Sequence, residues 1–219
     1  MYFEHDGAIE ISGNVMHGVA IGSGMGGNIY INRGKYVIHL SGEEGVGIGA
    51  LYADVNLMIQ KCNIEFDLIN STTVGIGSLY GNATISIAYT GLNGYFGSNK
   101  CVCIGSMEGK YCIFDETQAT ITLNARADIL CGVGCLNGDV SININSAAMI
   151  LEIQGKEAIA MGNYSKTANI QTKNADVSSN VKNSIGIDIG AEIFYSINGR
   201  GRYFLNGKEI VRECIEGDF

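Results

Sequence analysis

The stretch Val74-Gly75-Ile76-Gly77-Ser78 decides the fold, because close copies of it return along the whole chain. The glycine at its fourth position recurs with spacings of 27, 28, 28, 29, 28 and 28 residues. A near-constant period over most of a chain is the signature of a repeat architecture. The recurring glycines are Gly22, Gly49, Gly77, Gly105, Gly134, Gly162 and Gly190.

Apolar residues keep fixed places relative to this glycine. Ile, Val or Met stands one position before it, and Val, Ile or Cys stands three positions before it. The residue between them is small in every copy except the last, where it is Asp188. A period of two is typical of a β-strand, so the pattern predicts a strand with one buried face.

Two further strands follow within each repeat. Residues 140–144 (Val-Ser-Ile-Asn-Ile) represent the first of them and residues 120–123 (Thr-Ile-Thr-Leu) the second. Dipeptides such as Gly26-Gly27 and Gly81-Asn82, which tolerate positive φ, predict a tight turn before the first. We therefore predict an all-β fold: a right-handed parallel β-helix, that is, a three-faced β-solenoid of about seven coils of ~28 residues.

The repeat fills the chain, so we predict a single β-solenoid domain over residues 1–219. Residues 1–17 would form an incomplete first coil and residues 18–198 the repeats. Residues 199–219 would form a hairpin cap around an Asn206-Gly207 turn, covering the last open sheet edge.

Charge narrows the range of partners. Fourteen basic residues against 22 acidic ones give a net charge of −8, which disfavours nucleic acid and an anionic membrane surface. The chain has no run of ~18 apolar residues that could span a bilayer, and it starts without a signal-peptide pattern. Seven irregularly spaced cysteines do not indicate a disulfide framework. We expect a cytoplasmic protein if the chain is complete, and a cell-surface location if it is a fragment of an exported protein.

The Ile-Gly-Ser coils, followed by strands such as Gly27-Asn28-Ile29-Tyr30-Ile31, resemble the Gly-rich right-handed β-helix repeats of bacterial proteins. The resemblance covers almost the whole chain. Some of those proteins are adhesin-like or bind carbohydrates, including polyuronides. The resemblance therefore implies the fold, and it implies a polysaccharide as one possible ligand.

Four groups of residues are candidates for a site. The glycine column is either a flat binding strip or a corner with no room for a Cβ atom. Tyr52 and Tyr80 share one column with Met25 and are either a platform for a ligand or an ordinary surface ladder. Asp188 with Arg200 and Arg202 is either a catalytic set of the β-helix lyase type or an ion pair that caps the end. The cysteines at 101, 103, 112, 131 and 135 are either a metal cluster or buried thiols, and the parity of their strands favours thiols.

These observations favour a non-enzymatic binding or interaction module, part of a larger bacterial protein, that presents a repetitive face to a protein partner. A carbohydrate-binding or adhesin-like module is the first alternative, and a polysaccharide lyase or hydrolase is the second. We expect no catalytic residue, metal or cofactor, because no nucleophile, base and oxyanion donor occur together in a matched pattern.

Overall fold

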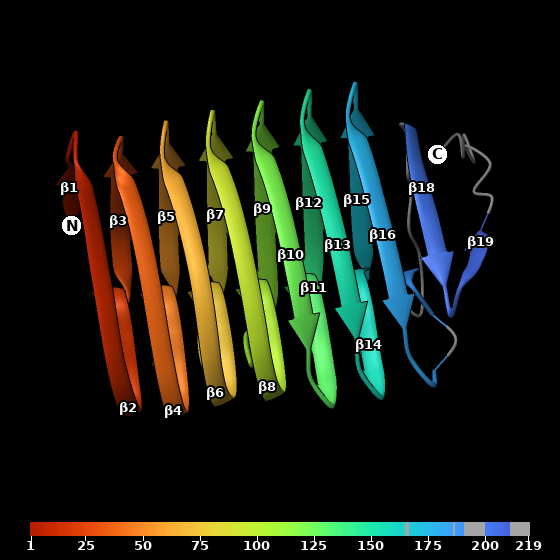
Figure 1. Ribbon diagram of the computed structural model, residues 1–219, viewed down its shortest axis with the longest axis horizontal. Helices are drawn as coiled ribbons and strands as arrows, with labels where there is room; N and C mark the ends of the chain where they lie inside the picture. Colours follow the sequence, from red (N-terminus) through yellow and green to blue (C-terminus); the bar gives the residue numbers. More distant parts are fainter. Residues whose placement is uncertain (165–166, 186, 191–199, 211–219) are drawn as a thin grey trace.

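A computed structural model of the chain describes residues 1–164, 167–185, 187–190 and 200–210. It shows a β-solenoid of parallel coils stacked side by side, with the N-terminal coil at one end (Figure 1). Seven strands, one from each coil, form the first sheet, in the order β1-β3-β5-β7-β9-β12-β15. Their bounds are Tyr2–Glu4, Gly27–Asn32, Val55–Gln60, Ala83–Ala88, Tyr111–Thr117, Asp139–Asn145 and Ala168–Lys173.

The second sheet bends around a corner and provides the other two faces of each coil. In the first four coils each of its strands is 16 residues long: β2 Ala8–Ser23, β4 Lys35–Ala50, β6 Asn63–Ser78 and β8 Gly91–Ser106. The later coils divide it into β10 Thr120–Arg126 and β11 Ile129–Cys135, β13 Ala148–Gln154 and β14 Glu157–Gly162, and β16 Asp176–Lys182 and β17 Ile189–Gly190. The repeat prediction of a solenoid of about seven coils is thus confirmed.

An antiparallel hairpin follows the coils at the C-terminal end. Strand β18 (Arg200–Leu205) continues the stack by pairing in parallel with β16, and β19 (Lys208–Ile210) turns back on it. The turn residues Asn206 and Gly207 have φ values of 50° and 79°. The part of the chain that is described contains no helix long and apolar enough to cross a membrane.

The glycine column is a site of close coil-to-coil approach. From Gly22 to Gly162 the described glycines of the column have φ between 115° and 147°, a region that side chains rarely adopt. A Cβ atom built on Gly77 would overlap the carbonyl oxygen of Gly105, and one on Gly49 would overlap that of Gly77. The column is therefore a packed corner of the coil, and its backbone does not form an open strip.

The Val and Ile columns, three positions and one position before the corner glycine, face different hydrophobic clusters. Val46 belongs to a small second cluster, whereas Ile48 belongs to the main core inside the coils. Gly47 between them drops out of the ladder register, and a Cβ atom on it would approach the Phe66 ring of the main core. The expectation of one buried face was wrong here, because the bend at Gly47 changes which side of the strand points inward.

Glycine is required in this turn for two reasons: a positive φ in the first coil, and a lack of room for a Cβ atom in later coils. Gly26 and Gly27 have φ values of 78° and 111°, as the dipeptide predicts. Gly81 and Gly109, in the same turn of later coils, do not have positive φ. A Cβ atom on either of them would overlap the backbone of the preceding coil, so stacking explains these glycines.

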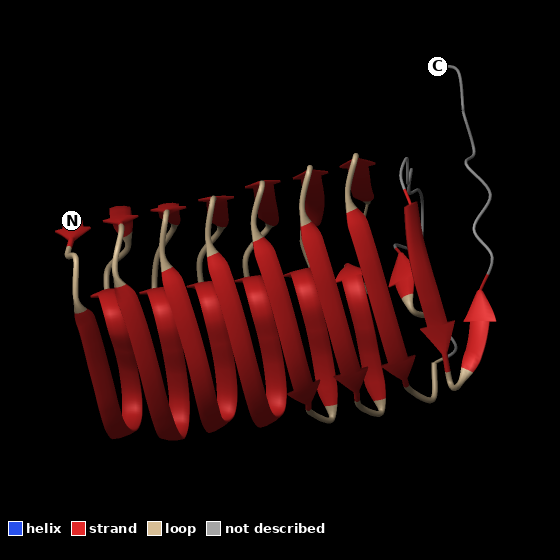
Figure 2. Ribbon diagram, turned by 45° about the horizontal axis from the view of Figure 1, so that its top comes forward, coloured by secondary structure: helices blue, strands red, loops and turns tan. Residues whose placement is uncertain are grey.

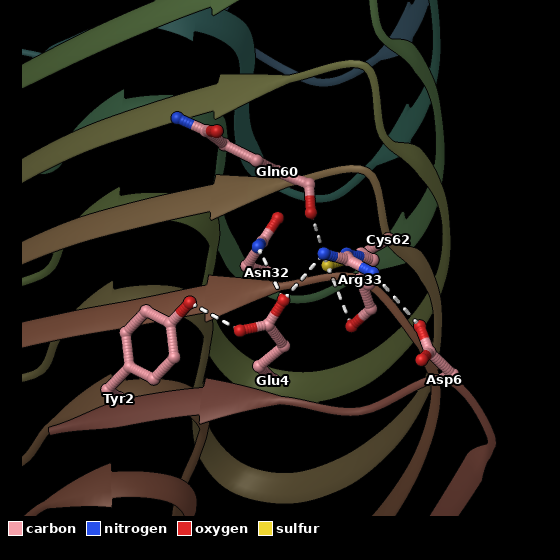
Figure 3. A network of polar contacts seen from close by, with 7 residues as sticks. All are labelled: Tyr2, Glu4, Asp6, Asn32, Arg33, Gln60 and Cys62. Carbon is pink, nitrogen blue, oxygen red and sulfur yellow. Dashed lines mark hydrogen bonds and ion pairs between the residues drawn. The ribbon is translucent and has the colours of Figure 1, made fainter.

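Positive φ occurs instead at the corner between the first and second sheets, and at residues other than glycine. In the first five coils the N–H of this corner residue donates a hydrogen bond to a carbonyl of the next coil, as Arg33 does to Gln60 at 2.9 Å. In the first coils the Arg33 side chain also pairs with Glu4 at 2.9 Å and with Asp6 at 3.5 Å (Figure 3). A left-handed residue costs about 1–2 kcal/mol, and these contacts offset that cost. The corner residues are Arg33, Lys61, Tyr89, Gln118, Ser146 and Asn174, with φ from 51° to 65°.

Variation in coil length is absorbed in one turn. The 27-residue spacing arises because three residues connect Ser23 to Gly27, whereas four connect the equivalent Ala50 to Val55. The 29-residue spacing arises from an extra residue in the turn after Ser106. The strands themselves keep their register through both changes.

One core column contains a buried carboxyl group. Glu116 stands between Ile87 and Ile144 in a column that otherwise holds Phe3 in the first coil, Ile in the following coils and Thr172 in the last. The residue is 1% exposed, and neither carboxyl oxygen has a hydrogen-bond partner among the described residues. Burial raises the pKa of Glu116 to about 8, so the carboxyl is protonated at neutral pH.

We expect Gly77→Val to lower the free energy of unfolding by about 2–4 kcal/mol, because it adds a backbone overlap to a disfavoured φ. Gly24→Val is the matched control, since a Cβ atom there has no neighbour within 4 Å and the φ is not positive. Thermal and urea melts measure both variants. A Gly77→Val protein as stable as the wild type would contradict the packed corner.

Glu116→Ile should stabilise the protein by about 2–4 kcal/mol at pH 8 and much less at pH 4.5. The folded pKa of Glu116, about 8, lies above its ordinary value of 4.5, so ionisation favours the unfolded chain. Wild-type stability should therefore fall as pH rises from about 4.5 to 8, and the variant should lose this slope. Urea melts across that range, with Glu65→Gln as an exposed control, test the assignment. Parallel slopes for wild type and Glu116→Ile would refute it.

Candidate binding surface

The second hydrophobic cluster fixes the turn that carries the predicted tyrosines. In the second to fifth coils the residue two positions after the corner glycine is buried and packs into this cluster. The following residue is consequently forced outward, toward solvent. The cluster consists of Val46, Leu51, Val74, Leu79, Val102, Met107, Cys131, Leu136 and Ile159.

Hydrogen bonds hold the same turn in register with its neighbours. The Ser78 hydroxyl accepts from the Gly81 N–H at 2.9 Å and donates to the Ala53 carbonyl at 2.8 Å. The Tyr80 N–H donates to the Leu51 carbonyl at 2.8 Å, which extends the coil-to-coil ladder into the turn. The tyrosines therefore stand on a backbone that is fixed at both ends.

Tyr52 and Tyr80 lie side by side on neighbouring coils, as their shared column predicts. Their ring centroids are 5.7 Å apart and their planes differ by 4°. Tyr52 is 52% exposed, Tyr80 44% and Met25 76%. We call Met25, Tyr52, Tyr80 and Glu108, which occupy the same place in successive coils, the tyrosine strip.

A second ladder runs beside the strip and orients its central ring. Residues His17, Glu44, Thr72 and Lys100 share one register column, which we call the charged ladder. Glu44 accepts a hydrogen bond from the Tyr80 hydroxyl, and its other oxygen lies 2.8 Å from Nδ1 of His17. Lys100 pairs with Glu108 at 2.5 Å. The Glu44 carboxylate beside the Tyr80 hydroxyl, together with partial burial, raises the pKa of Tyr80 to about 12.

The sequence analysis missed Glu44, His17 and Lys100. Their side chains differ in type, so no single-residue pattern marks the column. The available signal is the spacing, because each lies five positions before a corner glycine, just as the tyrosines lie three positions after one. A search for polar residues in phase with the glycine column would have found them.

The structure describes only part of the predicted charged set. Asp188 is 3% exposed and sits in the inward-facing column that holds Ala160 and Cys103 in earlier coils. Arg202 is exposed on β18, and the side chain of Arg200 lies outside the described residues. A catalytic use of Asp188, Arg200 and Arg202 remains a prediction.

The six cysteines that the structure describes are buried, and those on β8 and β11 lie on both sides of their strands. Cys101 and Cys103, with sulfur atoms 3.9 Å apart, face the main core, whereas Cys131 faces the second cluster. Burial raises the pKa of Cys103 and Cys131 well above that of a free thiol. Among the described residues, no three or more His, Cys, Asp or Glu side chains could together hold a metal ion.

Replacing Glu44 with Gln should lower the pKa of Tyr80 from about 12 toward 10, because the substitution removes the negative charge that opposes tyrosinate formation. NMR titration of ¹³C-labelled tyrosine follows the Tyr80 ring directly. Glu65→Gln, on another face, is the control and should leave the titration unchanged. An unaltered Tyr80 pKa in Glu44→Gln would show that the hydrogen bond does not hold in solution.

No family model matches the chain, no curated protein matches it, and no solved structure matches it. The function has to be argued from the geometry of the surface itself.

Proposed function

We propose that the protein is a non-enzymatic binding module that docks a protein partner on the tyrosine strip. The observation that carries this proposal is the stacked, exposed pair of Tyr52 and Tyr80 rings. The turn backbone and the Glu44 hydrogen bond restrict the tyrosines before any partner arrives. Rigid aromatic side chains lose little conformational entropy on binding, which is why tyrosine is common among the residues that dominate protein interfaces.

The stacking geometry favours a protein over a sugar. Sugar rings stack on exposed aromatic faces, yet Tyr52 and Tyr80 cover one face of each other at a centroid distance of 5.7 Å. What the strip offers outward is ring edges and the Tyr80 hydroxyl region, together with the flexible thioether of Met25. Edges, hydroxyls and methionine suit the mixed polar and apolar surface of a protein partner.

The strip also has the layout of a small interface. An apolar centre of Tyr and Met is bordered by His17 and Glu44 on one side and by the Lys100–Glu108 pair. Charged groups at the rim of an apolar patch set orientation and exclude wrong partners more than they add affinity. Both signs of charge occur at this rim, so the partner surface should also be mixed in charge.

The double variant Tyr52→Ala/Tyr80→Ala tests the proposal. Affinity purification from the native cell extract with quantitative mass spectrometry should identify proteins retained by the wild type and lost by the variant. The partner, once purified, should bind the variant at least about 30-fold more weakly, since removing an anchor residue costs about 2 kcal/mol or more. The variant should unfold within about 1 kcal/mol of the wild type, because both rings are exposed.

Tyr95→Ala is the matched control, because Tyr95 is also 44% exposed but lies on β8, on another face. The control should retain every partner that the wild type retains. A glycan array run in parallel addresses the carbohydrate alternative. Partner binding that survives the double variant, or polysaccharide binding that depends on the two tyrosines, would sink the protein-docking proposal.

A further inference from the structure

A shallow groove of about 630 Å³ runs along the second sheet in the last coils, where β10 meets β11, and shares no lining residue with the tyrosine strip. It crosses four successive coils, from Ser98 and Asn99 of the fourth to Lys182 and Asn183 of the seventh. Neighbouring coils lie ~4.8 Å apart, so the groove extends about 14 Å along the solenoid axis. An extended peptide of about four or five residues has this length.

The groove occurs where the repeat loses its regularity. In the first four coils the strand of the second sheet passes the position of the groove unbroken. In the fifth coil β10 ends at Arg126 and β11 begins at Ile129 (Figure 2). The next coil repeats the break, between Gln154 and Glu157. The break therefore belongs only to the coils that line the groove, and the solenoid stack does not require it.

Its charge is opposite to that of the chain. The chain carries a net charge of −8, yet the residues lining the groove include Arg126, Lys156 and Lys182 against the single carboxylate of Asp128. Lys156 pairs with Asp128 at 3.0 Å. Within the described part of the chain, Arg126 and Lys182 form no ion pair, and both are exposed.

The groove adjoins the proposed docking surface. Asn99 lines it, and the next residue, Lys100, is the member of the charged ladder that pairs with Glu108 of the tyrosine strip. We propose that the groove binds an acidic, extended segment of the protein partner that docks on the strip. This inference rests on the proposed function for the identity of the ligand, but the groove itself can be tested alone.

The chemistry of the lining fits such a segment. Guanidinium and ammonium groups bind Asp and Glu carboxylates, and the planar fork of Arg126 can hold one in two hydrogen bonds. Side-chain amides of Asn99, Gln154 and Asn183 line the same groove. The amides of Asn99 and Gln154 each offer a donor and an acceptor, as a peptide backbone requires, whereas the Asn183 amide donates to the Ala158 and Ile187 carbonyls. Three cations partly offset by one carboxylate suit a few carboxylates better than the dense phosphates of a nucleic acid.

Fluorescence anisotropy with a synthetic deca-glutamate peptide tests the groove directly. The wild type should bind it, and Arg126→Gln/Lys182→Gln should weaken binding by about ten-fold, because two charge-assisted contacts are lost. Lys110→Gln/Lys173→Gln removes the same charge from exposed positions outside the groove and should bind like the wild type. Asp128→Asn should bind the peptide about two- to five-fold more tightly, since it removes the one carboxylate among the described lining residues, which competes for the groove cations.

Tyr52→Ala/Tyr80→Ala should still bind deca-glutamate, which separates the groove from the strip. Loss of the partner with retained peptide binding in this variant would confirm that the two surfaces act independently. The inference is overturned if the peptide fails to bind, if the groove variant and the Lys110/Lys173 control weaken it equally, or if an oligo-uronate competes it away and binds more tightly than the peptide does.

Discussion

The approach of one coil's backbone to the next at the glycine column is the constraint on which the rest of the structure depends. Gly77 can take a φ of 140° and leave room for the Gly105 carbonyl only because it has no Cβ atom. With the coils held at that distance, the ladders of all three faces remain in register. The second cluster then packs against the turn that follows the corner glycine. That turn sets the direction of the Tyr52 and Tyr80 side chains.

The architecture could be predicted because the features that determine it recur. Gly77 and Ile76 have equivalents in every coil, so chance matches average out over seven copies. The division of the core into two clusters could not be predicted from the repeat. Alternation of inward and outward side chains assumes a regular strand, and the strand loses its regular pairing at Gly47. The left-handed corner was also invisible, because residues as different as Arg33 and Tyr89 occupy it. There the conformation is imposed by bonds to the next coil rather than by side-chain preference.

The candidate surface was predicted in part for the same reason. Tyr52 and Tyr80 repeat a residue type at a fixed phase, and the structure stacks them. Glu44 and Lys100 share a column but not a type, so composition gave no signal for them. The groove near Arg126 lies at a break of two residues between β10 and β11, where Ala127 and Asp128 still bond to the next coil. No sequence periodicity marks so local an interruption of a strand.

The turn that absorbs the differences in coil length has a consequence for how such a surface can change. A residue gained after Ser106, or lost after Ser23, leaves the strands on both sides in register. Insertions and deletions there are therefore nearly neutral for folding, whereas one inside a strand would exchange inward for outward side chains. Natural variants of this chain can thus change the surface at this turn, which carries the proposed tyrosine strip, while the strands of the scaffold stay unaltered. This separation of evolvable and fixed positions is the one on which engineered repeat-protein libraries are built.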